Sequence, residues 1–244
     1  MRNFSSRFLR NLLLTILLLT AQCANAQQSP QQLYNAIREK FLRVKDYKAD
    51  VRVKVDVNFL KMPPLNGIMY YKAPDKLRMD RRNGVSLMPR RSVNFSIANL
   101  VAGTNVDVLD GGIETTAGVP LRILRVIPRD PGSDIVLARL WVDEARMLVT
   151  RTESTTRDDG TVQTWLTYSN YTKDALPDKI LFVLDVKDFK MPKGVTMDYE
   201  GSVPEEQPKN SKDKGKRKKG RIEVTYLRYT VNQGLSDAVF KEGR

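Results

Sequence analysis

The sequence predicts a mainly β protein of the α+β class, built on one antiparallel sheet with a single N-terminal helix. Residues 47–59 alternate apolar and polar, mostly charged, side chains without interruption, which is typical of a strand with one buried and one exposed face. Shorter β-prone segments follow, separated by turn signals such as Asp159-Gly160. Because short turns join neighbouring strands, the later segments are expected to form a meander.

The N-terminal helix is predicted by its capping residues and by the spacing of its apolar side chains. Ser29 is a favourable N-cap, Pro30 suits the first helical position, and Gln32 completes a capping box. Four apolar residues recur at helical spacing: Tyr34, Ile37, Phe41 and Val44. An amphipathic helix of about four turns results, and its apolar face must lie on another apolar surface.

The other strands are placed by the turns that separate them. A Pro-Pro break leads from the long strand to residues 68–72, and the turn at 73–76 leads to residues 77–80. Residues 84–91 can be a loop or a short strand, and residues 93–101 a strand or a short helix. Further strands are predicted at residues 106–109, 121–127, 135–142, 148–154, 162–168, 180–186 and 221–231, with a short apolar anchor at 235–240.

Residues 1–26 have the parts of a secretory signal peptide. Three arginines make the positive region: Arg2, Arg7 and Arg10. Residues 12–19 are apolar, and Ala24-Asn25-Ala26 places small residues at the cleavage positions. The apolar run is much shorter than the roughly 20 residues that span a bilayer, so a cleaved signal is expected and not a membrane span.

The mature protein is therefore expected to be residues 27–244, secreted out of the cytoplasm as a single domain. The alternative is a lipid anchor on Cys23 at the end of the apolar run. A lipoprotein site prefers a small residue just before the cysteine, and here Gln22 occupies that position.

The composition removes most catalytic and metal chemistry. The sequence contains no histidine and one cysteine, Cys23, which is absent from the mature protein if the signal peptide is cleaved after Ala26. Without them there is no Ser-His-Asp triad, no thiolate nucleophile and no cysteine-ligated zinc. Asp158-Asp159 precedes Gly160, so a polar hairpin turn is favoured over a metal site. We expect a protein that is not an enzyme and has no metal or cofactor, with an extracytoplasmic hydrolase as a further alternative.

Residues 205–221 form a basic segment that cannot bury apolar surface. It has eight basic and three acidic residues, and it has no aromatic or branched aliphatic side chain. It is predicted to be a disordered loop between two strands. Four of its residues could contact anionic membrane surfaces: Lys216, Arg217, Lys218 and Lys219. Because the segment lacks interleaved aromatics and the chain is secreted, nucleic acid is not an expected partner.

A large sheet with one apolar face and few helices must bury that face in some way. A β-sandwich or barrel filled by its own side chains is one solution. A curved half-barrel, whose concave apolar face holds a lipid and is covered by the N-terminal helix, is another. Periodicity alone leaves both open.

Several sequence motifs, taken in order along the chain, resemble those of the LolA/LolB-like carriers of outer-membrane lipoproteins. After the helix and the long strand comes GIMYYKAPDKLRM at residues 67–79, similar to the hairpin of that family. The meander of that family is resembled by Leu140-Trp141-Val142-Asp143, followed by Asp158-Asp159-Gly160-Thr161. A motif found late in the family's sequences is resembled by FKMPKGV at residues 189–195. The resemblance covers most of residues 27–244.

The resemblance implies the curved half-barrel with its apolar concave face covered by the helix. It also implies a periplasmic carrier that binds acyl chains of lipoproteins or other lipids and moves them toward the outer membrane. Family members often place an arginine just before the hairpin proline, where it helps to hold the helical lid closed. Here that position is Ala73. A lipid- or lipoprotein-sensing regulatory module of the same fold is the alternative.

The site predicted on this basis is a lipid cavity under a lid helix. The lid residues are the four helix residues named above. The cavity residues are Val51, Val53, Val55, Val57, Ile68, Tyr70, Leu77, Met79, Leu140, Val142, Ile180, Phe182 and Leu184. The expected partners are the acylated cargo, donor and acceptor proteins at the inner and outer membranes, and a transient membrane surface.

Overall fold

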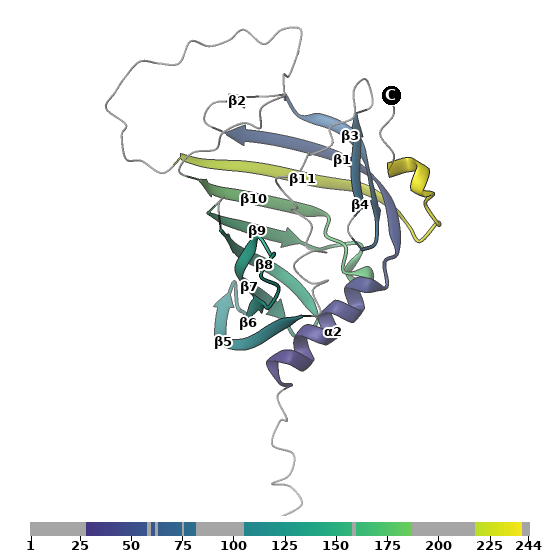
Figure 1. Ribbon diagram of the computed structural model, residues 1–244. Helices are drawn as coiled ribbons and strands as arrows, with labels where there is room; N and C mark the ends of the chain where they lie inside the picture. Colours follow the sequence, from purple (N-terminus) through teal and green to yellow (C-terminus); the bar gives the residue numbers. More distant parts are fainter. Residues whose placement is uncertain are drawn as a thin grey trace, which may run out of the picture.

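The computed structural model describes residues 28–57, 60–61, 63–74, 76–81, 105–157, 160–186 and 218–240. These residues form one curved antiparallel sheet that does not close into a barrel, with a single α-helix, α2, lying across one end (Figure 1). The predicted mainly β class and the curved, open sheet are confirmed. Residues 1–26, Cys23 among them, lie outside the described residues, as do residues 84–91 and 93–101.

The sheet order is β4-β3-β1-β11-β10-β9-β8-β7-β6-β5, and β2 pairs with β1 off this path. The chain therefore returns through β11 to the first strand, which places the last strand in the centre of the sheet. The bounds are α2 Pro30–Leu42, β1 Asp46–Val57, β2 Leu60–Lys61, β3 Leu65–Lys72, β4 Lys76–Arg81, β5 Val106–Thr116, β6 Val119–Pro128, β7 Ile135–Asp143, β8 Leu148–Thr156, β9 Thr161–Thr167, β10 Lys179–Val186 and β11 Lys218–Val231.

The ladder registers trace one continuous face across the sheet, because directly paired residues project to the same side. One row passes from β7 across β8, β9, β10 and β11 to β1. Its members are Leu140, Thr152, Thr164, Phe182, Ile222 and Val55. We call the side that carries this row the inner face, and the opposite side the outer face.

The long first strand forms as its alternation predicts. Ala49, Val51 and Val53 are buried on the inner face, whereas Lys48 and Arg52 are exposed on the outer face. A strand with such a pattern stabilises the sheet only in one register, because a slip by one residue would bury its charged face.

Helix α2 packs its apolar side onto the core of the inner face. The Ser29 hydroxyl accepts from the Gln32 backbone N–H and the Gln32 side chain accepts from the Ser29 N–H, so the predicted capping box is formed. Leu33, Tyr34 and Ile37 are buried in one cluster with the inner-face side chains, and Phe41 packs against that cluster. Val44 is buried as well, but it follows the helix, which ends at Leu42.

Several predicted boundaries differ from the structure. β5 continues past its predicted end at residue 109, because Gly111 and Gly112 form a bulge between Asp110 and Ile113 and do not end the strand. A Cβ at Gly111 would lie 2.7 Å from Ile123 Cγ2, so only glycine lets the two strands approach here. β3 begins at Leu65, and β11 begins at Lys218 and not at 221.

Candidate functional site

Most of the predicted cavity residues do lie on one apolar face. The pairings and burial place nine of them on the inner face: Val51, Val53, Val55, Leu77, Met79, Leu140, Val142, Ile180 and Phe182. Val57 and Leu184 lie in β1 and β10 at positions that continue the same alternation, although their side chains are outside the described ones. The face extends from β4 at one edge to β6 near the other.

Ile68 and Tyr70 were assigned to the wrong face. They pair with Asp50 and Lys48, whose side chains belong to the outer face. In β3 the inner positions are Met69 and Tyr71, with Leu65 further along the strand. The error arises because Ile68–Tyr71 are all apolar or aromatic, so this segment offers no alternation from which to choose the face.

A cluster of tyrosines fills the part of the inner face near the start of β1, and the sequence reading missed it. Tyr47 stacks on Tyr71 at a ring-centroid distance of 5.1 Å and meets Tyr229 edge-on at 5.2 Å. Tyr226 stacks on Tyr229 at 4.9 Å, and the Tyr229 hydroxyl donates to the Pro177 carbonyl at 2.7 Å. Burial raises the pKa of Tyr226 to about 12, so these phenols stay neutral near pH 7.

A β-bulge in β11 is the reason that the alternation of its sequence does not predict this cluster. Tyr226 and Tyr229 are three residues apart, so strict alternation would send them to opposite faces. β11 holds one extra residue, Leu227, between the pairs Val51–Tyr226 and Asp50–Arg228. The extra residue shifts the inward–outward alternation of β11 by one position, so both tyrosines project inward.

Helix α2 is held to the sheet at both ends by polar contacts. Arg122 Nη1 donates to the Gln28 carbonyl at 2.7 Å, just before the helix begins. Lys40 Nζ donates to the Arg146 carbonyl at 2.8 Å, near the helix end. These contacts, with the packing of its apolar side, keep the helix over one end of the inner face.

Arg122 is the buried charge of this arrangement. Its side chain is 5% exposed, and it forms ion pairs with Asp110 at 2.7 Å and Glu144 at 3.0 Å. Hydrogen bonds from the Gly112 N–H and from Arg122 hold the pKa of Asp110 below its ordinary value. The arginine that contacts the helix start therefore lies on β6, whereas residue 73 is an alanine.

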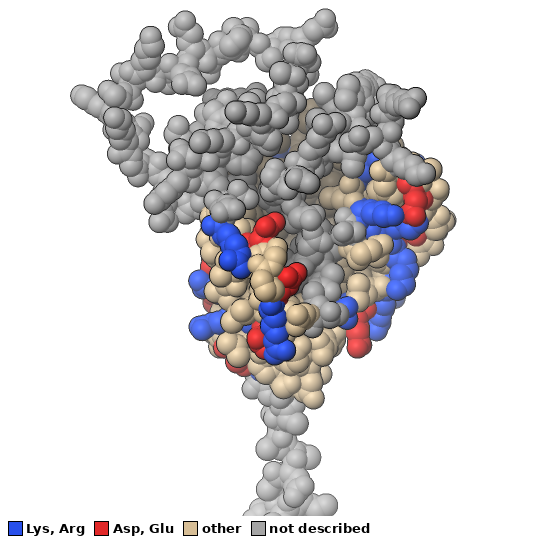
Figure 2. All heavy atoms as spheres, viewed as in Figure 1, with Lys and Arg blue, Asp and Glu red and all other residues tan. Residues whose placement is uncertain are grey.

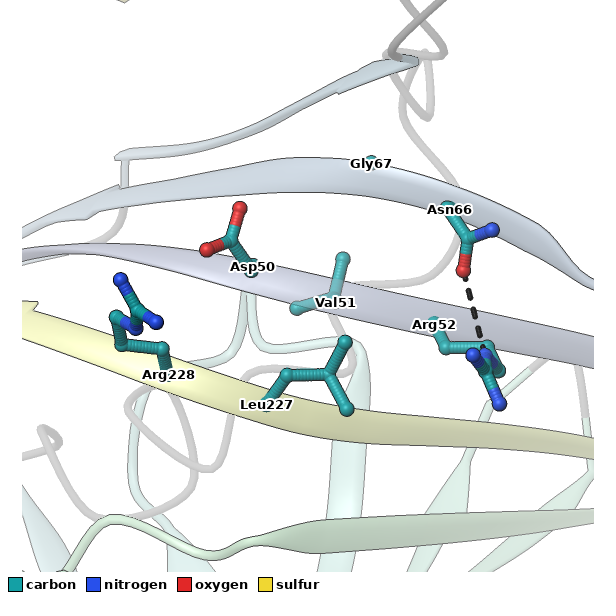
Figure 3. Close-up of a pocket in the computed structure, with 7 residues that line it drawn as sticks. All are labelled: Asp50, Val51, Arg52, Asn66, Gly67, Leu227 and Arg228. Carbon is teal, nitrogen blue, oxygen red and sulfur yellow. Dashed lines mark hydrogen bonds between the residues drawn. The ribbon is translucent and has the colours of Figure 1, made fainter.

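The outer face is polar where the bulge occurs. A groove of about 290 Å³ lies there between β1, β3 and β11 (Figure 3). Its lining residues are Asp50, Val51, Arg52, Asn66, Gly67, Leu227 and Arg228. Arg52 Nε donates to Asn66 Oδ1 at 3.3 Å across it. Charged and amide groups would be desolvated by an acyl chain, so this groove does not suit one.

Acidic and basic side chains lie close together over the described surface seen in Figure 2. Of the four basic residues predicted to contact anionic surfaces, Lys216 and Arg217 lie outside the described residues. Lys218 and Lys219 belong to β11, paired with Val186 and Asp185, so the end of the predicted loop was wrong there.

Within the described part of the chain, no three acidic or cysteine side chains gather as metal ligands would. No helix in the described ranges has the length and apolar character needed to cross a membrane.

No protein-family model matches the sequence, and no curated protein matches it. Solved structures of other proteins share its fold at low identity. A LolA superfamily protein from Nitrosomonas europaea superposes with a TM-score of 0.54 at 10% identity, covering 88% of this chain and 99% of the other. A DUF1329 family protein from Desulfovibrio piger gives 0.52 at 14% identity, covering 88% and 98%.

A putative outer membrane lipoprotein-sorting protein domain from Vibrio parahaemolyticus gives a TM-score of 0.52 at 11% identity, covering 85% of this chain and 95% of that domain. The likenesses extend over nearly the whole of each relative. They show that this chain has a LolA-like fold.

Proposed function

We propose that this protein is a periplasmic carrier that holds the acyl chains of lipoproteins or other lipids against its inner face and moves them toward the outer membrane. The observation that supports this most is the continuity of the apolar inner face across the ladders. The LolA-like fold supports it as well, since one relative of this fold is a lipoprotein-sorting domain by description.

Among the described residues, part of the inner face is not fully buried. Val55 and Ile222, paired across β1 and β11, are partly exposed, as are Leu77 and Met79 on β4. Each methylene of an acyl chain that leaves water contributes about 0.8 kcal/mol, so one chain lying along these residues gains several kcal/mol. Because the tyrosine cluster fills the inner face near the start of β1, we assign the acyl chain to the aliphatic side chains around Val55 and Ile222.

A carrier must also release its cargo, and helix α2 is the element suited to this. It contacts the sheet through one apolar side and through the Arg122 and Lys40 hydrogen bonds at its ends. Movement of α2 away from the sheet would expose the inner face to water and weaken acyl binding. A bound acyl chain favours the state in which the helix lies on the sheet, so opening favours release. Donor and acceptor proteins in the two membranes would use that opening.

The experiment is native mass spectrometry of the full chain purified from its own host. Wild-type protein is expected to carry acylated lipid or lipoprotein. Val55→Asp places a carboxylate on the partly exposed inner face and is expected to lower the bound lipid by about tenfold or more. Val183→Asp makes the same substitution on the outer face of β10 and should leave the lipid content unchanged.

A protein without lipid, or equal loss in both variants while circular dichroism stays unchanged, would contradict the proposal. Transfer of bound lipid to acceptor vesicles then distinguishes a carrier from a sensing module. A carrier passes its lipid on, whereas a sensor retains it.

A further inference from the structure

Three hydroxyl side chains interrupt the apolar inner face where it crosses β8 and β9. Thr152, Ser154 and Thr164 are only 0%, 8% and 5% exposed. Thr152 and Thr164 are direct partners in the β8–β9 ladder, and Ser154 is the next inward position along β8. They form a short polar row between the apolar side chains of Leu140 on β7 and Phe182 on β10.

Thr152 has no hydrogen-bond partner for its hydroxyl among the groups that the structure describes. A hydroxyl buried without a partner destabilises a fold, because it has given up its hydrogen bonds to water. Valine has nearly the same shape and would fill the same space without that loss. The packing of the protein therefore gives no reason for a threonine at this position.

The unpartnered hydroxyl lies among residues assigned to acyl binding. Thr152 pairs with Leu140 on β7, and Thr164 pairs with Phe182 on β10. An acyl chain along this row would bring the polar group at its end within reach of Thr152. The hydroxyl can donate to an oxygen of the ligand and so recover the hydrogen bond that it lacks.

The chemistry of the row selects a neutral oxygen. The ladder partners of Thr152 are uncharged, whereas a buried carboxylate would need a cation beside it. Arg122 is a nearby inner-face cation, on β6, and it already donates to Asp110, Glu144 and the Gln28 carbonyl. A free fatty acid would therefore meet no unengaged positive charge at these groups.

We infer that the inner face recognises the ester or amide carbonyl oxygen that joins an acyl chain to its head group, with Thr152 as hydrogen-bond donor and Thr164 beside it. The inference rests on the proposed acyl binding and adds the class of ligand. Because Thr152 is fully buried, the side chains that cover it must move before a ligand can reach it.

The test compares two lipids that differ by one oxygen atom. Delipidated full chain is titrated with 1-palmitoylglycerol, which has an ester carbonyl, and with 1-O-hexadecylglycerol, which has an ether in its place. Wild type is expected to bind the ester roughly three- to tenfold more tightly, the range of one neutral hydrogen bond. Thr152→Val is expected to abolish this preference while keeping the affinity for the ether.

Thr155→Val is the matched control, since Thr155 lies on β8 but on the outer face, where its hydroxyl is 3.4 Å from that of Thr161. It should keep the preference for the ester. Thr152→Val should also leave the melting temperature of the lipid-free protein unchanged or raise it, because the unpaired hydroxyl is gone. If the Thr152 hydroxyl stabilised the fold instead, Thr152→Val would lower the melting temperature of the lipid-free protein.

Equal affinity of wild type for the two lipids overturns the inference and leaves acyl binding intact. A preference that survives both Thr152→Val and Thr164→Val also overturns it. Failure of wild type to bind either lipid contradicts the proposed function itself. If Thr152→Val does not fold, the inference is judged on Thr164→Val, which must reduce the preference.

Discussion

Arg122 is the residue through which the sheet and the start of the helix depend on one another. Its guanidinium is almost fully buried and donates to two carboxylates and one backbone carbonyl. A buried charge is tolerated only when its partners are in place, so the position of Gln28 and the ionised state of Asp110 are linked to this side chain.

Replacing Arg122 by alanine should lower the free energy of unfolding by about 1–3 kcal/mol, because four hydrogen bonds from the guanidinium are lost while the two carboxylates remain partly exposed. Urea unfolding measures the change. Arg125→Ala, at an exposed position on the same strand, should change it by less than about 0.5 kcal/mol. Similar losses in the two variants would show that Arg122 has no special role.

Asp237 holds the short 3₁₀ turn at Asp237–Phe240 to the β3–β4 hairpin. Hydrogen bonds from Lys72 and Lys76 lower the pKa of this carboxyl to about 2. Since the folded-state pKa lies below the unfolded one, its contribution to stability is complete above about pH 5 and is lost as the pH falls through 4 toward 2.

The difference in free energy of unfolding between wild type and Asp237→Asn should therefore be constant from pH 5 to 7 and shrink below pH 4. Denaturant titrations across this range measure it. The effect is small because the carboxylate is 59% exposed. A difference that grows as the pH falls would contradict the assigned contacts.

Side chains on strands with clean alternation were placed correctly from sequence, as Val51 and Val53 show. Ile68 and Tyr70 were placed on the wrong face, because an unbroken apolar run has no alternation that shows which side chains point inward. Arg122 gave no signal at all, since an arginine between two apolar residues reads as an exposed strand position. Its burial depends on Asp110 and Glu144, which are brought to it only by the fold.

At the scale of elements, α2 is the part whose local sequence decides its stability. Its capping box satisfies backbone N–H groups that would otherwise lack partners at the helix start. This end also carries the Arg122 contact, so loss of the cap should loosen the helix over the inner face.

Ser29→Ala should cost about 1 kcal/mol in the free energy of unfolding and should speed hydrogen exchange in the first turn of the helix. Gln31→Ala, at an exposed position in that turn, serves as the control. If Ser29→Ala exchanges no faster than Gln31→Ala, the helix start is held by packing and not by its cap.

The helix start and most strands could be predicted because caps, alternation and turns are local signals. The bulges in β5 and β11 could not, because a bulge is defined by its partner strand. Gly111-Gly112 resembles a turn until Ile123 is seen against it. Likewise, Tyr226 and Tyr229 share a face only because Leu227 is extra relative to β1.

At the scale of the molecule, the openness of the sheet follows from its strand order. The edges are β4 and β5, which lie at opposite ends of the order and do not pair. An open, curved sheet leaves one apolar face to be covered by something other than a second sheet. Periodicity predicted the one-sided sheet, whereas the choice between a filled barrel and an open one depends on which strands meet.

Photo-crosslinking with a diazirine-labelled palmitoyl lipid tests most directly that acyl chains lie on the inner face. Labelled peptides identified by mass spectrometry should come from β10 and β11, at inner-face residues such as Phe182 and Ile222, and excess unlabelled lipid should suppress them. Labelling confined to the outer-face groove around Leu227, or spread evenly over both faces, would contradict the account.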